Sequence, residues 1–281
     1  MRTTMFLRVF RPAKSTHRRV DRIRLVCLLA PLVAGAIACT PPQSRLEPRL
    51  RSDGFPESVG LPAFRPGDQI VRHFAMTLSY DEEHEVAAWV AHDLSRDRLR
   101  GGVDRSDDFR PDPAIPTGSA TLADYRRSGF DRGHLAPAGD FTWSERAMSE
   151  SFYLSNVAPQ RPSLNRGLWR RLETLVRRRA ERDGFLHVVT GPIYLGECAR
   201  IGPNRVGVPH AFFKVLFDPH PPEVKAIGFI VPHEGYAGSP RDFAVTVRQV
   251  ESVTGIDFFA ALPDDLEEAI ETTIEVELWM D

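Results

Sequence analysis

One short stretch of the chain carries a histidine, two asparagines and a glutamate among many arginines. These residues are His134, Asn156, Asn165 and Glu173. A histidine can deprotonate water, and oxygen ligands can hold a hard cation such as Mg²⁺, which keeps most of its own waters. A positioned base and a bound cation are what the hydrolysis of a phosphodiester requires. The stretch therefore predicts metal-assisted phosphodiester hydrolysis.

The separation of Asn165 and Glu173 supports a shared ion. They are eight residues apart in a segment with helical periodicity, so their side chains project within about 80° of each other. The two side chains could share one ion, with the longer reach bridged by water, and His134 could serve as the base. Taken singly, a histidine is more often a core or surface residue, an asparagine a turn or cap residue, and a glutamate a solvated helix residue. Only the spacing of these residues relative to one another favours a catalytic role for them.

The candidates lie in three motifs, which are Gly129-Phe130-Asp131-Arg132-Gly133-His134-Leu135-Ala136, Phe152-Tyr153-Leu154-Ser155-Asn156-Val157-Ala158-Pro159-Gln160, and Leu164-Asn165-Arg166-Gly167-Leu168-Trp169 continuing to Leu172-Glu173. In this order the motifs resemble the DNA/RNA non-specific endonucleases with a ββα-metal fold, most closely the bacterial relatives in the endonuclease G branch. Weaker similarity at residues 105–116, 189–192, 208–214 and 253–259 extends the resemblance from about residue 60 to the C-terminus.

The resemblance implies a role for each matched position. It makes His134 the general base, Asn165 the direct Mg²⁺ ligand and Glu173 the holder of a metal-bound water. Mn²⁺ is the expected substitute for Mg²⁺. It also implies an α+β fold in which a metal-site helix packs against a mixed or antiparallel sheet, and it implies DNA and RNA as substrates.

Further roles come from the same resemblance. Asn156 would orient the catalytic groups, and Arg132 would contact phosphate. The family also has an arginine shortly before an aromatic residue upstream of these motifs, and Arg105, which precedes Phe109, is the closest counterpart. Attack by hydroxide with departure of the 3′ oxygen would leave 5′-phosphate products.

Charge is unevenly distributed along the chain. The formal net charge is −2, but residues 1–38 hold eight basic residues and one acid, so the remainder is strongly acidic. Residues 155–182 nevertheless contain eight arginines against two glutamates, whereas residues 264–281 contain eight acids and no lysine or arginine. A local basic region on an acidic body suits phosphate contacts confined to one cleft. The candidate nucleic-acid contacts are Arg132, Arg161, Arg166 and Arg170.

The first residues have the pattern of a targeting segment. Eight basic residues precede an apolar run from Leu25 to Ala38, which is too short to span a bilayer comfortably. Because the run ends at Ala38-Cys39, it is similar to a bacterial lipoprotein signal, with Cys39 as the acylated first residue and membrane anchor. Secretion after cleavage near Ala38, to the periplasm or outside the cell, and import into the mitochondrial intermembrane space remain as alternatives.

These features divide the chain into a signal segment at residues 1–38, a flexible tether at residues 39–58 and an endonuclease domain at residues 59–281. Cys27 belongs to the signal and Cys39 to the anchor, so Cys198 has no partner within the mature chain. It is either buried or able to link two copies into a homodimer.

Secondary-structure patterns favour α+β, because strands and helices do not alternate regularly. We expect a hairpin from residues 74–80 and 86–92, a loop over 105–123, a short helix from a capping box at Thr142 and Glu145, and a strand over 153–157. We also expect a main helix over 164–182, strands over 186–189, 211–217 and 224–231, and a helix over 243–253.

Two other classes of function fit parts of this pattern. A surface lipoprotein could use a nuclease-like fold for binding alone, but it would not need His134 as a base. A phosphodiesterase acting on a substrate other than nucleic acid would keep all the same residues.

Overall fold

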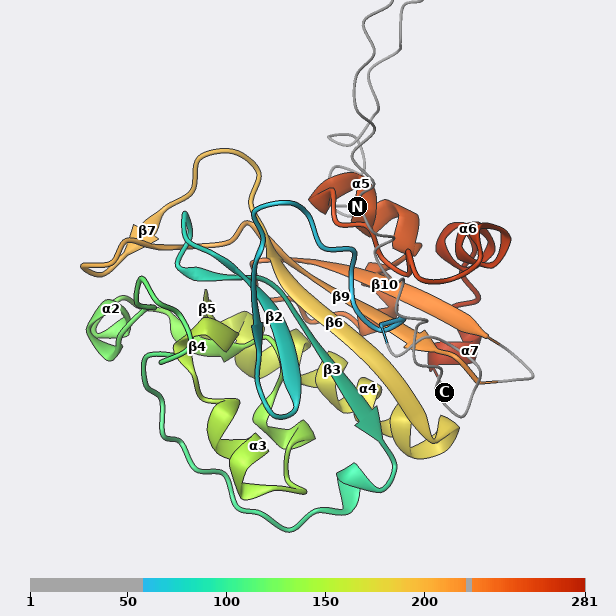
Figure 1. The fold of residues 1–281 in the computed structure, drawn as a ribbon, viewed down its shortest axis with the longest axis horizontal. Coiled ribbons are helices and arrows are strands. Elements are labelled where there is room, and N and C mark those ends of the chain that lie inside the picture. Colours follow the sequence, from blue (N-terminus) through green and yellow to red (C-terminus); the bar gives the residue numbers. More distant parts are fainter. Residues whose placement is uncertain (1–57, 221–223, 281) are drawn as a thin grey trace, which may run out of the picture. The chain divides into compact units, whose positions relative to one another are not determined.

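A seven-stranded antiparallel sheet forms the centre of the described chain in this computed structural model, which covers residues 58–220 and 224–280. The strand order is β1-β2-β3-β6-β9-β10-β11, and Figure 1 labels its middle strands β2, β3, β6, β9 and β10. The strands are β1 Gln69–Arg72, β2 Met76–Asp81, β3 Val86–Ser95, β6 Phe185–Ile193, β9 Ala211–Asp218, β10 Lys225–Pro232 and β11 Ala244–Val245. The expected leader, Cys39 and nearly all of the tether lie outside the described residues.

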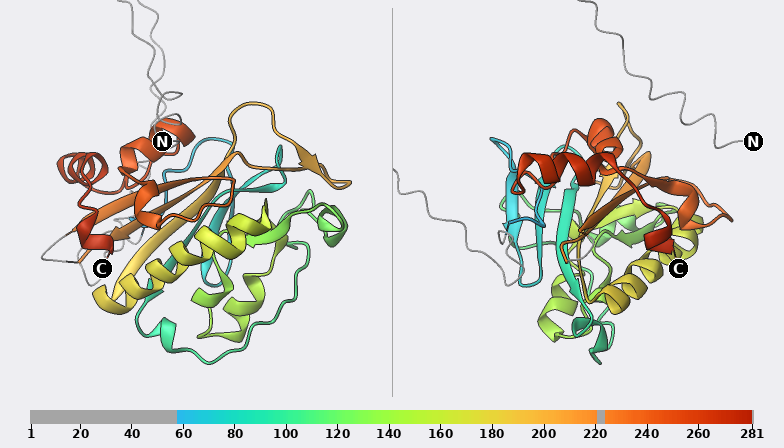
Figure 2. Two further views of the ribbon diagram at one scale, coloured as in Figure 1. Left: turned by 180° about the vertical axis from the view of Figure 1, so that it is seen from behind. Right: turned by 90° about the vertical axis from the view of Figure 1, so that its right-hand side faces the viewer.

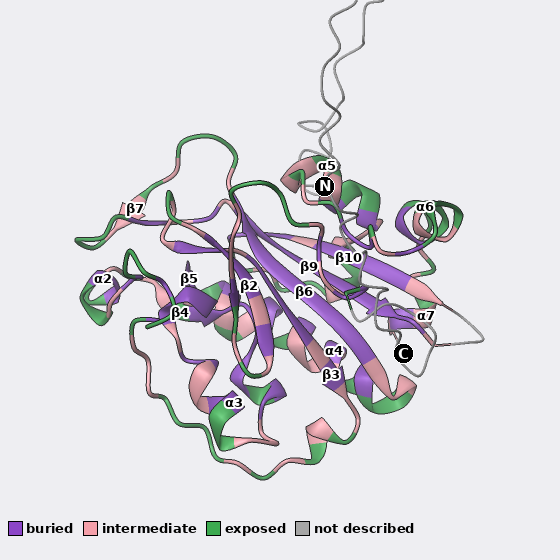
Figure 3. Ribbon diagram, viewed as in Figure 1, coloured by how far each residue is buried: buried purple, intermediate pink, exposed green. Residues whose placement is uncertain are grey.

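Helices cover both faces of the sheet (Figure 2). One face packs against α4 (Arg170–Asp183) through Leu172 and Val176, together with Phe212 and Leu216 of β9. The other face packs against α5 (Val247–Thr254) and α6 (Asp264–Thr272). Because both faces are covered, the central strands are almost continuously apolar and buried (Figure 3). The expected α+β class, with an antiparallel sheet and a helix packed on it, is confirmed.

A two-stranded ribbon carries the first two motifs on the α4 side of the sheet. Strand β4 (Asp131–His134) pairs antiparallel with β5 (Val157–Gln160), placing Asp131 opposite Gln160 and His134 opposite Val157. Gly133 faces the Gln160 side chain so closely that a Cβ there would lie 2.2 Å from Oε1. Only glycine allows this approach, so the Asp-Arg-Gly-His sequence fits the pairing of the ribbon.

The predicted main helix is interrupted near its start. Leu164–Trp169 form a π-helical turn that contains Gly167 with non-helical φ and ψ, and regular α-helix begins only at Arg170. The constant 100° per residue assumed between Asn165 and Glu173 therefore does not hold across this segment. At the other end Gly184 terminates the helix with a φ of 98°, as the sequence predicts.

Several other expectations are confirmed by the structure. The hairpin is β2 with β3, the strands near 186, 211 and 224 are β6, β9 and β10, and residues 105–121 form a loop. The late helix begins at Val247 rather than at residue 243. Its start is delayed because Ala244–Val245 pair with β10 and Thr246 caps the helix.

Two expectations were wrong in detail. Ser144, rather than Thr142, caps the short helix α3 (Glu145–Glu150), because its hydroxyl accepts a hydrogen bond from the Ala147 amide. Residues 154–156 form a 3-10 helix instead of a strand, and β5 begins only at Val157. The 3-10 turn buries the Asn156 side chain completely. In an extended strand this side chain would project from one face of the ribbon.

The remaining elements are short. They are α2 Leu122–Tyr125, α7 Glu277–Met280, the hairpin β7 Arg200–Ile201 with β8 Val206–Gly207, and 3-10 turns at Arg98–Arg100, Ala138–Asp140 and Pro240–Phe243. Among the described residues, the helices are all too short or too polar to cross a membrane.

Candidate active site

His134 ends strand β4 and is enclosed by aromatic rings. The Phe109 and Phe152 ring centroids lie 5.2 and 4.9 Å from its imidazole, and the residue is 8% exposed. Its Nε2 atom is buried without a hydrogen-bond partner. Burial, together with the positive charges of Arg105 and Arg132, lowers the pKa of His134 to about 3. The ring is therefore neutral at physiological pH, which is the form that accepts a proton.

Asn156 holds the chain that follows His134. Its amide oxygen accepts a hydrogen bond from the Ala136 amide at 2.9 Å, and its Nδ2 donates to the carbonyls of Ala136 and Ser151 at 2.9 and 2.8 Å. The side chain is fully buried. These contacts fix the backbone just beyond His134.

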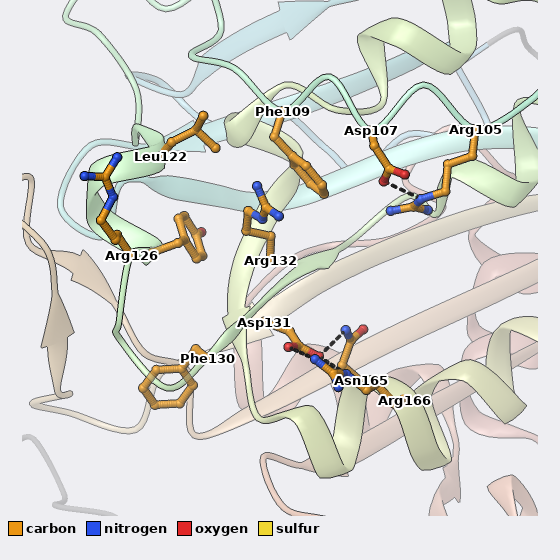
Figure 4. Close-up of a pocket in the computed structure, with 11 residues that line it drawn as sticks. Arg105, Asp107, Phe109, Leu122, Arg126, Phe130, Asp131, Arg132, Asn165 and Arg166 are labelled. Carbon is orange, nitrogen blue, oxygen red and sulfur yellow. Dashed lines mark hydrogen bonds and ion pairs between the residues drawn. The ribbon is translucent and has the colours of Figure 1, made fainter.

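Asp131, at the other end of β4, links the ribbon to the start of the metal-site helix (Figure 4). Its carboxylate accepts hydrogen bonds from Asn165 Nδ2 at 3.0 Å and from two nitrogens of Arg166 at 2.8 and 2.7 Å. Although burial acts in the opposite direction, the bonds from Arg166 and Asn165 hold the pKa of Asp131 below its usual range. The sequence analysis did not assign this role to Asp131, despite its place in the first motif.

The amide of Asn165 is oriented in a way that suits a cation ligand. Its nitrogen is engaged by Asp131, and among the described residues nothing donates a hydrogen bond to its oxygen. A neutral amide oxygen left without a donor fits the coordination of Mg²⁺. Asn165 therefore fits the position of direct metal ligand.

Glu173 adds a half-buried carboxylate on the first turn of α4. Its carboxylate forms no hydrogen bond or ion pair within the described part of the chain, and burial raises its pKa above the usual range. Lys214 of β9 opposes this rise, and Asp140 adds to it. A half-buried carboxylate without a partner among the described residues is stabilised by a nearby cation, so the oxygens of Asn165 and Glu173 are candidate metal donors.

The arginines assigned to the site fall into two groups. Arg105 forms an ion pair with Asp107 at 2.6 Å and lies over the Phe152 ring, and Arg132 lies over the Phe109 ring at 4.1 Å. Both act electrostatically on His134. They share with Asn165 a groove of 580 Å³ that is open to solvent.

The guanidinium groups of Arg161, Arg166 and Arg170 have different surroundings. Arg166 is bound to Asp131, which leaves less of its charge for a ligand. The Arg161 side chain is exposed, and its backbone N–H donates to His233 Nε2 at 2.7 Å. Arg170 is exposed one turn further along the helix.

Three buried groups behind the site were not found from the sequence. Lys214 donates to Thr190 and lies over the Trp169 ring at 5.0 Å, close enough to Glu173 to affect its pKa. His92 and Arg177 hold the two oxygens of Asp140 at 3.0 and 3.1 Å. A lysine inside the apolar run of β9 was the one available sequence signal, because a fully buried lysine needs a partner.

A separate group of carboxylates lies on the other side of the sheet. The nearest oxygens of Glu251, Asp257 and Glu271 fall within 4.8 Å of one another, a spacing that could accept a metal ion. Arg248 already forms ion pairs with Glu251 and Glu271 at 3.3 and 2.8 Å. Since this arginine supplies the positive charge, we assign no ion to this group.

The depressed pKa of His134 predicts a specific dependence of stability on pH. The unfolded chain binds a proton near pH 6.5, whereas the folded chain does not until about pH 3. The contribution of His134 to the free energy of unfolding is therefore complete above pH 6.5 and is lost as the pH falls toward about 3. Between about pH 7.5 and 5, wild type should lose about 2 kcal/mol more unfolding free energy than His134→Asn. Urea denaturation measures both proteins, and equal losses would contradict the buried, neutral state.

Comparison with known proteins agrees with this geometry. Residues 59–265 match the family model of the DNA/RNA non-specific endonucleases. The chain is 35% identical to the mitochondrial nuclease EXOG of Mus musculus over 80% of its own length, and 37% identical to the mitochondrial endonuclease G of Homo sapiens over 71%. It spans 64% of the first of these relatives and 71% of the second.

Two further matches extend the comparison. A nuclease of Nostoc sp. is 28% identical over 88% of this chain and 97% of the relative. A crystal structure of an EndoG/EndoGI complex superposes with a TM-score of 0.67 at 33% identity, covering 72% of this chain and 89% of that chain. With the family model covering most of the sequence, the chain belongs to the DNA/RNA non-specific endonuclease family.

Proposed function

We propose that this protein is a Mg²⁺-dependent endonuclease that hydrolyses DNA and RNA with little preference for sugar or sequence. One observation carries the proposal. Within the described residues, a neutral histidine, an amide oxygen that accepts no hydrogen bond and a half-buried carboxylate that forms no ion pair lie near an arginine-lined groove. Nothing in the packing of the core requires this combination, whereas phosphodiester hydrolysis uses each member.

The residues of the chain divide the chemical work between them. His134 takes a proton from the attacking water, because its ring is neutral at physiological pH and has a nitrogen lone pair to accept that proton. Asn165 would hold Mg²⁺ directly and Glu173 would hold it through a bound water, and the bound ion would neutralise charge on the phosphate and on the leaving oxygen. Asp131 keeps the Asn165 amide turned toward this position. Departure of the 3′ oxygen leaves a 5′-phosphate product.

Arg105 and Arg132 supply the substrate contacts nearest to the base. They lie beside the two rings that enclose His134 and line the same groove as Asn165. Guanidinium groups that contact phosphate position a strand without reading its bases. This is the physical basis for expecting cleavage at many sequences.

Replacing the base should abolish cleavage. We expect His134→Ala to lower turnover of plasmid DNA in Mg²⁺ by ~10²–10⁴-fold, the usual contribution of a positioned general base. Nucleic-acid binding should persist, because the arginines are untouched. His220→Ala, at a remote histidine after β9, is the matched control and should cleave normally. Retention of more than about a tenth of wild-type turnover by His134→Ala would exclude this histidine as the base.

Asn165→Ala tests the metal ligand. The variant should require more Mg²⁺ for half-maximal activity or lose activity entirely, and EDTA should silence the wild type. Zn²⁺ should support little turnover, since the donors are hard oxygens. Full activity of the wild type in EDTA would be incompatible with the proposed metal dependence.

We propose that the protein is held in the cell envelope by a lipid anchor at Cys39. This cysteine lies outside the described residues. Each acyl methylene buried in a membrane contributes about 0.8 kcal/mol. The mature chain should begin at Cys39 and partition with membranes, and Cys39→Ser should yield a soluble or unprocessed form. Mass spectrometry that finds an unmodified N-terminus elsewhere would reject the anchor and favour secretion or the mitochondrial alternative.

A further inference from the structure

A second groove lies along the solvent-facing side of α4, away from the catalytic residues. It has a volume of 630 Å³ and runs between the helix, the turn at Ser239–Pro240 and Met280 near the C-terminus. Three arginines line it, namely Arg170, Arg171 and Arg178, together with Thr174 and Leu175. No carboxylate is among the described residues that line it. We refer to it as the α4 groove.

The spacing of its cationic residues follows the helix. Arg170, Thr174 and Arg178 are four residues apart, so they form one stripe about 12 Å long. Phosphates on one strand of a duplex are about 3.4 Å apart along its axis. The stripe therefore spans three to four phosphates of such a strand.

The arginines at both ends of the stripe keep their charges available. Arg170 and Arg178 are exposed, and the structure records no ion pair or side-chain hydrogen bond for either guanidinium within residues 58–220 and 224–280. Their neighbour Arg177 is instead paired with Asp140. Exposed arginines elsewhere, such as Arg146 and Arg248, are bound to glutamates.

The far wall of the groove is held by the third arginine. Arg171 donates from Nη2 to the carbonyls of Tyr236 and Gly238 at 2.9 and 2.8 Å. These bonds fix the loop at residues 236–238 against α4, and the Arg171 cation remains within the groove. The α4 groove is thus a supported cationic surface.

We propose that the α4 groove binds the phosphodiester backbone of a nucleic-acid chain at a distance from the bond being cut. The inference rests on the proposed nuclease function and assigns a second binding site to the same substrate. Helix α4 connects the two sites, because the turn that carries Asn165 leads directly into it, and Arg178 lies about 12 Å along the helix from its first residue, Arg170. A strand must therefore extend several nucleotides beyond the active site to reach Arg178. Contacts to backbone alone are consistent with a site that does not select sequence.

Substrate length gives the decisive experiment. Arg178→Glu should raise KM for a duplex of about 30 base pairs by about tenfold and leave kcat unchanged, while cleavage of an oligonucleotide of about four nucleotides should be unaffected. The matched control is Arg72→Glu, which reverses an exposed arginine on β1 near Phe64. It should match wild type on both substrates.

Binding measured without turnover separates this inference from the nuclease proposal. In EDTA, fluorescence anisotropy with the long duplex should show weaker binding by Arg178→Glu, and Arg178→Gln should lower the salt slope by about one. Thr174→Lys, which adds a cation to the stripe, should strengthen binding. Unchanged KM and unchanged affinity in all three variants would overturn the second site while leaving wild-type cleavage intact. A wild type that cleaves neither substrate would refute the nuclease itself.

Discussion

The carboxylate of Asp131 is the contact on which the geometry of the site depends. His134 and Asp131 occupy opposite ends of one four-residue strand, so the position of one fixes the other. Asp131 then binds both Asn165 and Arg166 at the start of the metal-site helix. A single side chain therefore sets the distance between His134 and Asn165, which we propose as the base and the metal ligand. The ion pair with Arg166 also keeps the carboxylate charged, which maintains the bond to the Asn165 amide.

Near the site lies a group of buried and half-buried charged side chains that the packing of a hydrophobic core would not require. Lys214 and Glu173 have opposite charges and each moderates the effect of burial on the other's pKa. Asp140 brings His92 and Arg177 into the same region. Burying such groups costs stability unless they are paired, so their presence indicates a role other than packing.

Much of this arrangement could be predicted from the sequence. The three motifs identified His134, Asn156, Asn165 and Glu173, and the structure brings all four to one region. Apolar runs with strand character located β6, β9 and β10, since these strands are buried on both faces. Such apolar runs are local patterns in the sequence. They predict the correct element wherever the burial of apolar side chains determines the backbone conformation.

The features that escaped prediction depend on contacts between distant segments. The break at Gly167 is a backbone conformation that helical periodicity does not reveal. The role of Asp131 requires knowing that β4 lies beside a helix more than thirty residues later. Charge shows the same limit, because the acid-rich helix α6 packs on one face of the sheet and the arginine-rich helix α4 on the other. Net charge alone is unfavourable for binding a polyanionic ligand, whereas the fold separates the two signs and leaves a cationic surface on the side of the site.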